Sequence, residues 1–317
     1  MGQTLVNARV TNSPQTALDP LAKSVEALTD LLGKPEGEPR PLEGGITNRN
    51  YRARFGGSEV VIRLPGKDTA LLEIDREAER AANENAARVG VAPAVAALLS
   101  DPAALVTYFV EGREMTAAEL REPTALAEVA RALRAVHESG ARLPIAFSGF
   151  RIVESYAERA ARRGVEVPDS YAWALAEATR IENALGEGDP VPCHNDLLAA
   201  NFLRGADGLR IVDWEYAGMG NRYFDLGNFA VNNELGPEQE AALAGEYFGR
   251  PAAARELASL RLMRFMSDFR EAMWAVLQGS LSDLDFDFAA YADEHFERLR
   301  ATAADPSFAG WLEQARG

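Results

Sequence analysis

The spacing of three oxygen-bearing side chains near the middle of this 317-residue chain constrains its fold most strongly. Asp196 precedes Asn201 by five positions, and residues 202–212 follow as two short runs on either side of a glycine-containing turn at 205–208. Two such runs around a turn of this kind predict a β-hairpin. Because a hairpin returns the chain to its starting point, we expect Asp213 to lie beside Asn201.

These three residues supply the groups that phosphoryl transfer from ATP to a hydroxyl requires. The reaction needs a carboxylate to receive the hydroxyl proton and hard oxygen ligands to hold Mg²⁺ against the phosphates. In protein kinases the catalytic-loop aspartate also precedes a metal-binding asparagine by five positions, and a second aspartate follows. The set Asp196, Asn201 and Asp213 therefore indicates kinase-like chemistry.

Length and composition are those of an ordinary globular protein, at 47% hydrophobic and 26% charged residues. The formal net charge of −15 argues against a nucleic-acid partner, serves solubility and would attract a cationic substrate. No apolar run approaches the roughly 20 residues of a membrane helix, and residues 1–20 lack the order of a secretory signal. A single cysteine, Cys193, forms no internal disulfide. We expect a cytoplasmic protein without a membrane partner. Whether the chain forms a homodimer is left open.

Hydrophobic patterns predict an α+β fold with two lobes, since 317 residues exceed what one compact core usually holds. We expect a loose arm over residues 1–20, a nucleotide-binding lobe over 21–110 and a helical lobe over 111–317. The first lobe is predicted to contain helices at 21–32 and 74–89 and antiparallel strands within 42–55, 59–64 and 104–110. The second is predicted to contain helices at 116–138, 152–163, 171–185, 237–247, 252–279 and 286–303.

The turn Gly44-Gly45-Ile46-Thr47-Asn48 is a candidate for binding ATP phosphates. Backbone N–H groups in a tight turn bind anions, although a glycine pair between strands is more commonly a simple hairpin turn. Kinases also place a cation on the third strand to hold the phosphates. Arg63 is the natural candidate here, and Lys67, just beyond the strand, is a second possibility.

A helix glutamate orients this cation in kinases. Glu79 is our choice for that partner, with Glu77 and Glu84 as competitors, because a glutamate on a helix usually faces solvent.

Two residues near the predicted base are expected to support the loop. His194 can brace it through hydrogen bonds, because Asp196 already provides the base. Asp225 is expected to cap backbone amides and anchor the loop. Farther along, Trp274 and Tyr291 either pack in the core or contribute to a cage for a quaternary ammonium, at about 0.5–2 kcal/mol per ring.

Together these motifs resemble the choline/ethanolamine kinase branch of the aminoglycoside phosphotransferase-like enzymes, which have a protein-kinase-like fold. The resemblance runs from about Leu42 to Arg298. It is carried by the glycine turn, Asp75-Arg76 with Glu79, His194-Asn195-Asp196 with Asn201, Asp213-Trp214-Glu215-Tyr216, Phe224-Asp225-Leu226-Gly227-Asn228 and Trp274-Ala275-Val276-Leu277-Gln278.

The resemblance implies specific roles for several residues. Asp196 looks like the catalytic base, and Asn201 and Asp213 look like the Mg²⁺ ligands. Arg63 coincides with an arginine that this branch uses in place of the usual lysine. Glu215 falls where choline kinases carry an acidic residue close to the metal and substrate. The hinge that binds adenine falls at 107–112, which includes Tyr108 and Val110.

One position departs from the family pattern. Animal choline kinases carry two tryptophans three residues apart on the late helix, whereas this chain has Glu271 at the first position and Trp274 at the second. Glu271 still favours a cationic acceptor, so a small amino alcohol such as choline or ethanolamine is expected. The same chemistry on an aminoglycoside, a sugar or another metabolite alcohol is an alternative, as is a catalytically silent, nucleotide-binding regulatory protein.

Overall fold

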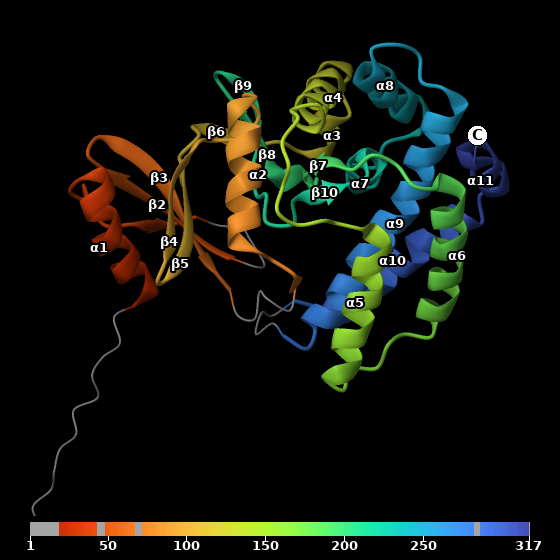
Figure 1. The fold of residues 1–317 in the computed structure, drawn as a ribbon, viewed down its shortest axis with the longest axis horizontal. Helices are drawn as coiled ribbons and strands as arrows, with labels where there is room; N and C mark the ends of the chain where they lie inside the picture. Colours follow the sequence, from red (N-terminus) through yellow and green to blue (C-terminus); the bar gives the residue numbers. More distant parts are fainter. Residues whose placement is uncertain (1–18, 43–47, 67–71, 282–285, 317) are drawn as a thin grey trace, which may run out of the picture.

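The computed structural model describes residues 19–42, 48–66, 72–281 and 286–316 (Figure 1). Five residues discussed above lie outside this part of the chain: Gly44, Gly45, Ile46, Thr47 and Lys67. Most of the arm expected over residues 1–20 also lies outside it.

A five-stranded antiparallel sheet forms the N-terminal part, with the strand order β1-β2-β3-β5-β4. Its strands are β1 (Arg40–Pro41), β2 (Asn48–Phe55), β3 (Ser58–Pro65), β4 (Val95–Ser100) and β5 (Ala103–Tyr108). Alternate residues of β3, Val60 and Ile62, pack with Leu28 of helix α1 (Pro20–Leu32). Because side chains alternate along a strand, Val61 and Arg63 face the opposite side of the sheet.

Helix α2 (Arg76–Arg88) covers that opposite side and stands between the sheet and the helical part of the molecule (Figure 1). The Asp75 side chain caps its first turn by accepting a hydrogen bond from the Ala78 N–H. Glu79 lies in the buried first turn of the helix, on the side that faces Arg63.

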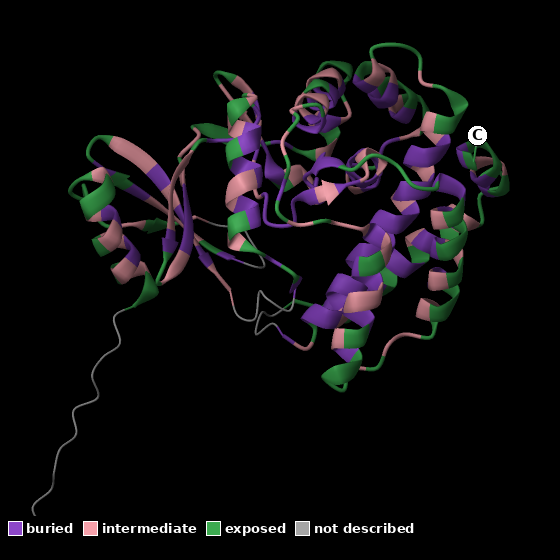
Figure 2. Ribbon diagram, viewed as in Figure 1, coloured by how far each residue is buried: buried purple, intermediate pink, exposed green. Residues whose placement is uncertain are grey.

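The rest of the chain is mainly helical. Its helices are α3 (Ala117–Leu120), α4 (Pro123–His137), α5 (Gly149–Arg162), α6 (Ser170–Leu185), α7 (Arg222–Asn232), α8 (Pro237–Phe248), α9 (Ala254–Gln278), α10 (Phe288–Ala303) and α11 (Phe308–Arg316). Most of α9 is buried, because α5, α7, α10 and α11 pack around it (Figure 2). This central helix therefore fixes where its side chains meet the site.

Short strands and one turn of 3₁₀ helix carry or flank Asp196, Asn201 and Asp213. The strands are β6 (Gly112–Glu114), β7 (Val191–Cys193), β8 (Phe202–Gly205), β9 (Gly208–Ile211) and β10 (Gly218–Gly220), and the 3₁₀ turn is η2 (Ala199–Asn201). Strands β8 and β9 form the predicted hairpin. It closes at its base through a hydrogen bond from the Val212 N–H to the Asn201 carbonyl oxygen, 3.0 Å long.

The predicted α+β fold class is confirmed, while several elements differ from their prediction. The expected helix at 116–138 is divided into α3 and α4, since Pro123 begins a new helix. Strand β4 and helices α7 and α11 were not predicted. Helix α7 carries Asp225, Gly227 and Asn228, which are weak helix formers. Tertiary contacts compensate for their low helix propensity.

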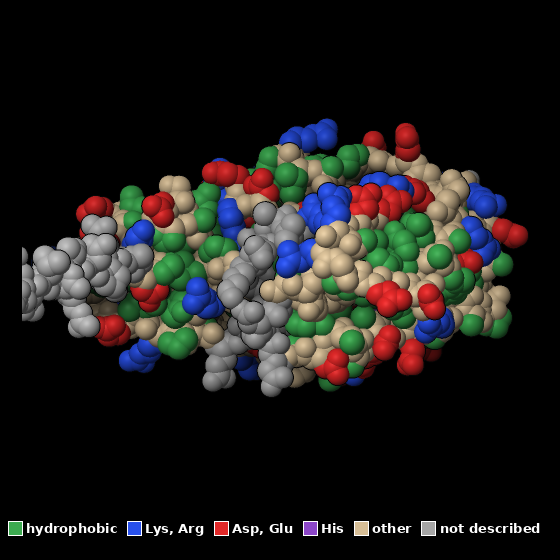
Figure 3. All heavy atoms as spheres, turned by 90° about the horizontal axis from the view of Figure 1, so that it is seen from below, with side chains coloured by type: hydrophobic (Ala, Val, Ile, Leu, Met, Phe, Trp, Pro, Cys, Tyr) green, Lys and Arg blue, Asp and Glu red, His purple; other side chains and the backbone are tan. Residues whose placement is uncertain are grey.

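Charged side chains are mixed on the surface. On the face drawn in Figure 3, the described Lys and Arg side chains lie among Asp and Glu side chains and form no continuous basic stripe. Within the described ranges, no helix has the length and apolar character needed to cross a membrane.

Candidate active site

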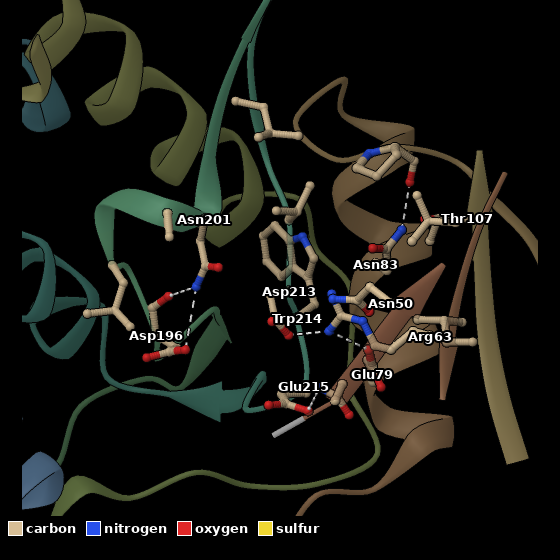
Figure 4. Close-up of a pocket in the computed structure, with 18 of the residues that line it drawn as sticks. Asn50, Arg63, Glu79, Asn83, Thr107, Asp196, Asn201, Asp213, Trp214 and Glu215 are labelled. Atoms are coloured by element: carbon tan, nitrogen blue, oxygen red, sulfur yellow. Dashed lines mark hydrogen bonds and ion pairs between the residues drawn. The ribbon is translucent and has the colours of Figure 1, made fainter. Parts of the chain in front are cut away.

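A cavity of about 760 Å³ lies where the sheet, α2, the β8–β9 hairpin and α9 meet. Among the described candidates from the sequence, twelve line it: Asn48, Arg63, Glu79, Tyr108, Val110, Asp196, Asn201, Asp213, Glu215, Glu271, Trp274 and Tyr291. The two expected support residues, His194 and Asp225, are fully buried behind the wall. The fold thus gathers residues that lie more than 200 positions apart in the sequence into one site. Figure 4 labels some of the lining residues, from Asn50 to Glu215.

The Asp196 carboxylate is held from two sides. Arg270 Nη1 lies 3.3 Å from Asp196 Oδ1, and Asn201 Nδ2 lies 3.4 Å from Asp196 Oδ2. Asn201 Nδ2 also donates to the Asp196 carbonyl oxygen at 2.8 Å, which fixes the orientation of its amide. Burial, the first cause, raises the pKa of Asp196, and the negative charges of Glu271 and Asp213 raise it further, while Arg270 acts to lower it.

His194 connects the Asp196 loop to the segment before Asp213. Its Nε2 donates to the Val212 carbonyl oxygen at 2.9 Å, so Nδ1 is the acceptor for the Asp196 N–H at 3.2 Å. Burial lowers the pKa of the imidazole, which favours this neutral form. The ring also packs edge-on against Trp214. His194 therefore joins the two carboxylate-bearing segments from behind the cavity wall.

Asp225 anchors the same loop from α7. Its carboxylate accepts hydrogen bonds from the backbone N–H of His194 at 2.9 Å and of Asn195 at 2.7 Å. Its Oδ2 also lies 2.9 Å from His137 Nε2. Asn195 has a φ of +69°, a conformation that non-glycine residues rarely adopt, so the anchor holds the loop in a strained form.

Three buried groups near this anchor, His137, Cys193 and Asp225, place their ligand atoms within 4.8 Å of one another. Both nitrogens of His137 are engaged, since Nδ1 lies 2.8 Å from the Tyr247 hydroxyl. Both oxygens of Asp225 are engaged as well, and burial raises the pKa of the Cys193 thiol. We interpret the cluster as a structural hydrogen-bond network.

Asp213 and Glu79 both contact Arg63. Arg63 Nη1 lies 3.2 Å from Glu79 Oε1 and also pairs with Asp213 Oδ1 (Figure 4). Burial acts to lower the pKa of the guanidinium, but the charges of Asp213 and Glu79 outweigh it and raise the pKa above its usual range. The competing glutamates, Glu77 and Glu84, instead pair with Arg80 on an exposed face.

A second arginine, Arg76, joins the sheet to the Asp213 segment. It contacts Glu79 Oε2 at 2.5 Å and Asn48 Oδ1 at 2.7 Å, and it lies 3.6 Å from Glu215 Oε2. Asn48 Nδ2 in turn donates to Glu215 Oε2 at 2.7 Å. Burial, followed by the charge of Asp213, raises the pKa of Glu215. Asn48, the first residue of β2, thus lies directly beside Glu215.

The two ends of the cavity differ in chemistry. At the sheet end its walls are largely apolar or neutral apart from the Arg63–Glu79 ion pair, and they include Val61, Leu105, the segment 107–110, Leu203 and Val212. At the α9 end they are aromatic and charged and include Tyr216, Arg270, Glu271, Trp274 and Tyr291. Asp196, Asn201 and Asp213 lie between the two ends.

At the α9 end, Glu271 is the centre of a polar cluster. Its Oε1 pairs with Arg270 Nη1, and its Oε2 accepts a hydrogen bond of 3.3 Å from the Tyr291 hydroxyl. The Trp274 ring packs edge-on against the Tyr291 ring at 6.1 Å, and Trp274 Nε1 donates to the Tyr216 hydroxyl at 3.0 Å. The late-helix residues chosen from the sequence therefore contact one another at this end of the cavity.

The sequence reasoning missed two arginines of the site. Arg76 was noted only as part of a motif, although its position three residues before Glu79 places both on one helix face. Arg270 directly precedes Glu271, and nothing local distinguishes it from the exposed arginines of the chain. Its burial depends on how α9 packs against the loop that carries Asp196.

Asn201 and Asp213 fit a divalent cation. Because Asn201 Nδ2 bonds to Asp196, its amide oxygen turns toward the side where Asp213 lies (Figure 4). Asp213 has a φ of +67°, a strained conformation of the kind found at ligand-binding sites. Amide and carboxylate oxygens are the ligands that Mg²⁺ prefers.

Known proteins resemble this chain in sequence. The model of the phosphotransferase enzyme family matches residues 38–262. Protein LicA of Haemophilus influenzae is 26% identical over 212 residues, which are 64% of this chain and 61% of LicA. Ethanolamine kinase 2 of Rattus norvegicus is 27% identical over 301 residues, which are 84% of this chain and 76% of that protein.

A solved structure extends the match to almost the whole chain. The crystal structure of a choline/ethanolamine kinase family protein from Mesorhizobium loti superimposes with a TM-score of 0.78 and 31% identity, covering 92% of this chain and 99% of that one. The family match, this coverage and the resemblance carried by the sequence motifs agree. The chain belongs to the phosphotransferase enzyme family, within its choline/ethanolamine kinase branch.

Proposed function

We propose that this chain is an ATP- and Mg²⁺-dependent kinase that phosphorylates the hydroxyl of a small amino alcohol such as ethanolamine or choline. One observation carries the proposal: Asp196, Asn201 and Asp213 meet in one cavity, between a mainly apolar end and an acidic, aromatic end. We assign the first end, formed with residues 21–110, to the nucleotide, and the second, within 111–317, to the acceptor.

Each side chain then has a defined task. Asp196 accepts the proton of the acceptor hydroxyl, oriented by Asn201 on one side and Arg270 on the other. Asn201 and Asp213 would hold Mg²⁺, which supplies charge neutralisation for the phosphates. Arg63 binds nucleotide phosphates in place of its contact with Asp213, while Glu79 keeps the guanidinium in position.

The acceptor end suits an organic cation. Glu271 provides negative charge, and Trp274 and Tyr291 provide aromatic surface beside it. Glu215, two positions after the proposed metal ligand Asp213, lines the same cavity. The names of the relatives, ethanolamine kinase 2 and a choline/ethanolamine kinase family protein, support an amino alcohol as the acceptor.

Substitution of the proposed base tests the reaction. We expect Asp196→Asn to lower kcat for ADP release by about 10²–10⁴-fold, because a positioned general base contributes a factor of this size. Nucleotide affinity, measured by calorimetry, stays within about twofold, since the metal and phosphate ligands remain. Asp207→Asn, in the exposed turn of the β8–β9 hairpin, is the matched control. Turnover by Asp196→Asn at the control's rate would exclude the assignment.

An acceptor panel tests the substrate class. ADP release is measured with ethanolamine, choline, aminoglycosides and sugars at equal concentrations. Turnover of an aminoglycoside or a sugar without turnover of either amino alcohol would transfer the chemistry to another acceptor. ATP binding without turnover of any alcohol would favour a regulatory protein.

A further inference from the structure

Arg270 places a permanent positive charge inside the acceptor end of the cavity. Its side chain is almost completely buried, and its guanidinium pairs with Glu271 and lies 3.3 Å from Asp196 Oδ1. The guanidinium carbon stands 4.4 Å from the centre of the Tyr216 ring. Both carboxylates hold the pKa of the guanidinium above its usual range against the opposing effect of burial, so the charge is present at every working pH.

A bound organic cation requires the same environment that the Arg270 guanidinium occupies. A quaternary ammonium is held by the faces of aromatic rings and by nearby negative charge, because it has no N–H group to donate. Here the chain's own guanidinium already covers a face of Tyr216 and already pairs with the two nearest carboxylates. An acceptor cation cannot occupy the same place.

Arg270 is not arranged to bind the acceptor itself. Its Nε and Nη2 are enclosed by protein atoms and make no hydrogen bond within the described part of the chain. They are therefore closed off from the cavity, and only Nη1 contacts the carboxylates. The geometry is that of a fixed counter-cation beside the carboxyl groups of Asp196 and Glu271.

What remains open to an acceptor amine is the Glu271 side. Among the residues that the structure describes, Glu271 Oε2 accepts one hydrogen bond, of 3.3 Å from the Tyr291 hydroxyl, and an oxygen of this kind can accept more than one. Trp274 and Tyr291 stand beside it, edge to face with each other. An ammonium with N–H groups can bond to this oxygen, whereas a trimethylammonium cannot.

We propose that Arg270 is a specificity-determining residue that selects an acceptor amine with N–H groups, such as a primary ammonium, over a quaternary one. This inference rests on the proposed function, since it concerns which amino alcohol the kinase accepts. Arg270 acts by filling the place against Tyr216 that a quaternary ammonium would need, and it leaves hydrogen bonding to Glu271 as the main contact for the amine.

The test uses a graded series of acceptors with the full-length protein. Ethanolamine, its N-methyl and N,N-dimethyl derivatives and choline lose one N–H donor at each step while keeping the hydroxyl. We expect kcat/KM to fall along the series, with choline about tenfold below ethanolamine, which corresponds to the loss of one charge-assisted hydrogen bond. A wild-type enzyme that uses choline as well as ethanolamine would overturn the inference without any variant.

Arg270→Met then removes the guanidinium and uncovers the Tyr216 ring. We expect kcat to fall with both acceptors, because Asp196 loses a contact. The choline-to-ethanolamine ratio of kcat/KM rises about tenfold, which corresponds to the free energy of one cation–π contact. Arg270→Lys keeps the charge and retains the ethanolamine preference. Arg264→Met, on the same helix but paired with Glu240 away from the cavity, leaves the ratio unchanged.

The outcomes separate this inference from the proposed function. Absence of ADP release with every member of the series in the wild type contradicts the proposed amino-alcohol acceptor, on which this inference rests. A second outcome is that Arg270→Met melts cooperatively and turns over both acceptors, but its choline-to-ethanolamine ratio of kcat/KM stays within twofold of the wild type. This outcome contradicts only the role of Arg270. If Arg270→Met does not fold, the wild-type series and Arg270→Lys decide the question.

Discussion

Replacement of Asp225 by asparagine tests whether the catalytic loop depends on an anchor outside the cavity. The fully buried carboxylate accepts bonds from two backbone N–H groups, those of His194 and Asn195, and contacts His137 Nε2. Asparagine has the same shape but carries an NH₂ group in place of one oxygen. At least one donor then faces another donor, and the negative charge is lost.

The magnitude follows from these contacts. A hydrogen bond to a charged group contributes about 1.5–3 kcal/mol, and a buried donor left unpaired costs a further 1–3 kcal/mol. We therefore expect Asp225→Asn to lower the free energy of unfolding by about 3–5 kcal/mol, as for other buried charge pairs. At about 2 °C per kcal/mol for a chain of this size, Tm falls by about 6–10 °C.

Thermal melting followed by circular dichroism measures this loss, and Asp305→Asn is the matched control. Asp305 is exposed, and its carboxylate accepts a hydrogen bond from the Ser307 N–H, which an asparagine side chain can also accept. A Tm of Asp225→Asn within about 2 °C of the control would refute the reasoning.

The same variant gives a pH test. Burial acts to raise the pKa of Asp225, but the hydrogen bond and charge of His137 outweigh it, so the pKa lies below its ordinary value of 3.8. Stability from a carboxyl with a lowered pKa is present above the unfolded value and is lost as pH falls through the folded value. The stability difference between wild type and Asp225→Asn should therefore be constant near neutral pH and shrink below pH 3.8. A difference that grows in acid would contradict this assignment.

Two further substitutions test the nucleotide end and the packing of the helical part. Glu79→Gln weakens the ion pair that positions Arg63, so we expect KM for ATP to rise about tenfold, whereas Glu77→Gln, on the exposed face, leaves it unchanged. An equal effect of both variants would argue against the positioning role. Gly227→Ala places a Cβ 2.7 Å from the α9 backbone and should lower the free energy of unfolding by about 1–3 kcal/mol. Gly245→Ala meets only ordinary contacts and should stabilise the protein slightly, and denaturant unfolding distinguishes the two.

Local sequence was sufficient wherever a short stretch carries its own geometry. The β8–β9 hairpin follows from its glycine-containing turn, and helix α2 follows from a run rich in Ala, Glu and Arg that ends at a glycine. Helix α7 could not be predicted in this way. Its Asp225, Gly227 and Asn228 disfavour a helix locally, but each one meets a specific partner in the fold, including the backbone of α9.

The sequence by itself determined the fold class, the family and the meeting of Asp196, Asn201 and Asp213, because the spacing of these three residues depends only on a loop and a hairpin within about twenty residues. Only the tertiary structure decided that Arg270 stands beside Asp196 and that it covers Tyr216. The physical reason is distance along the chain. Arg270 and Asp196 lie 74 positions apart, and the packing of α9 among the other helices, rather than any local pattern, brings their charges together.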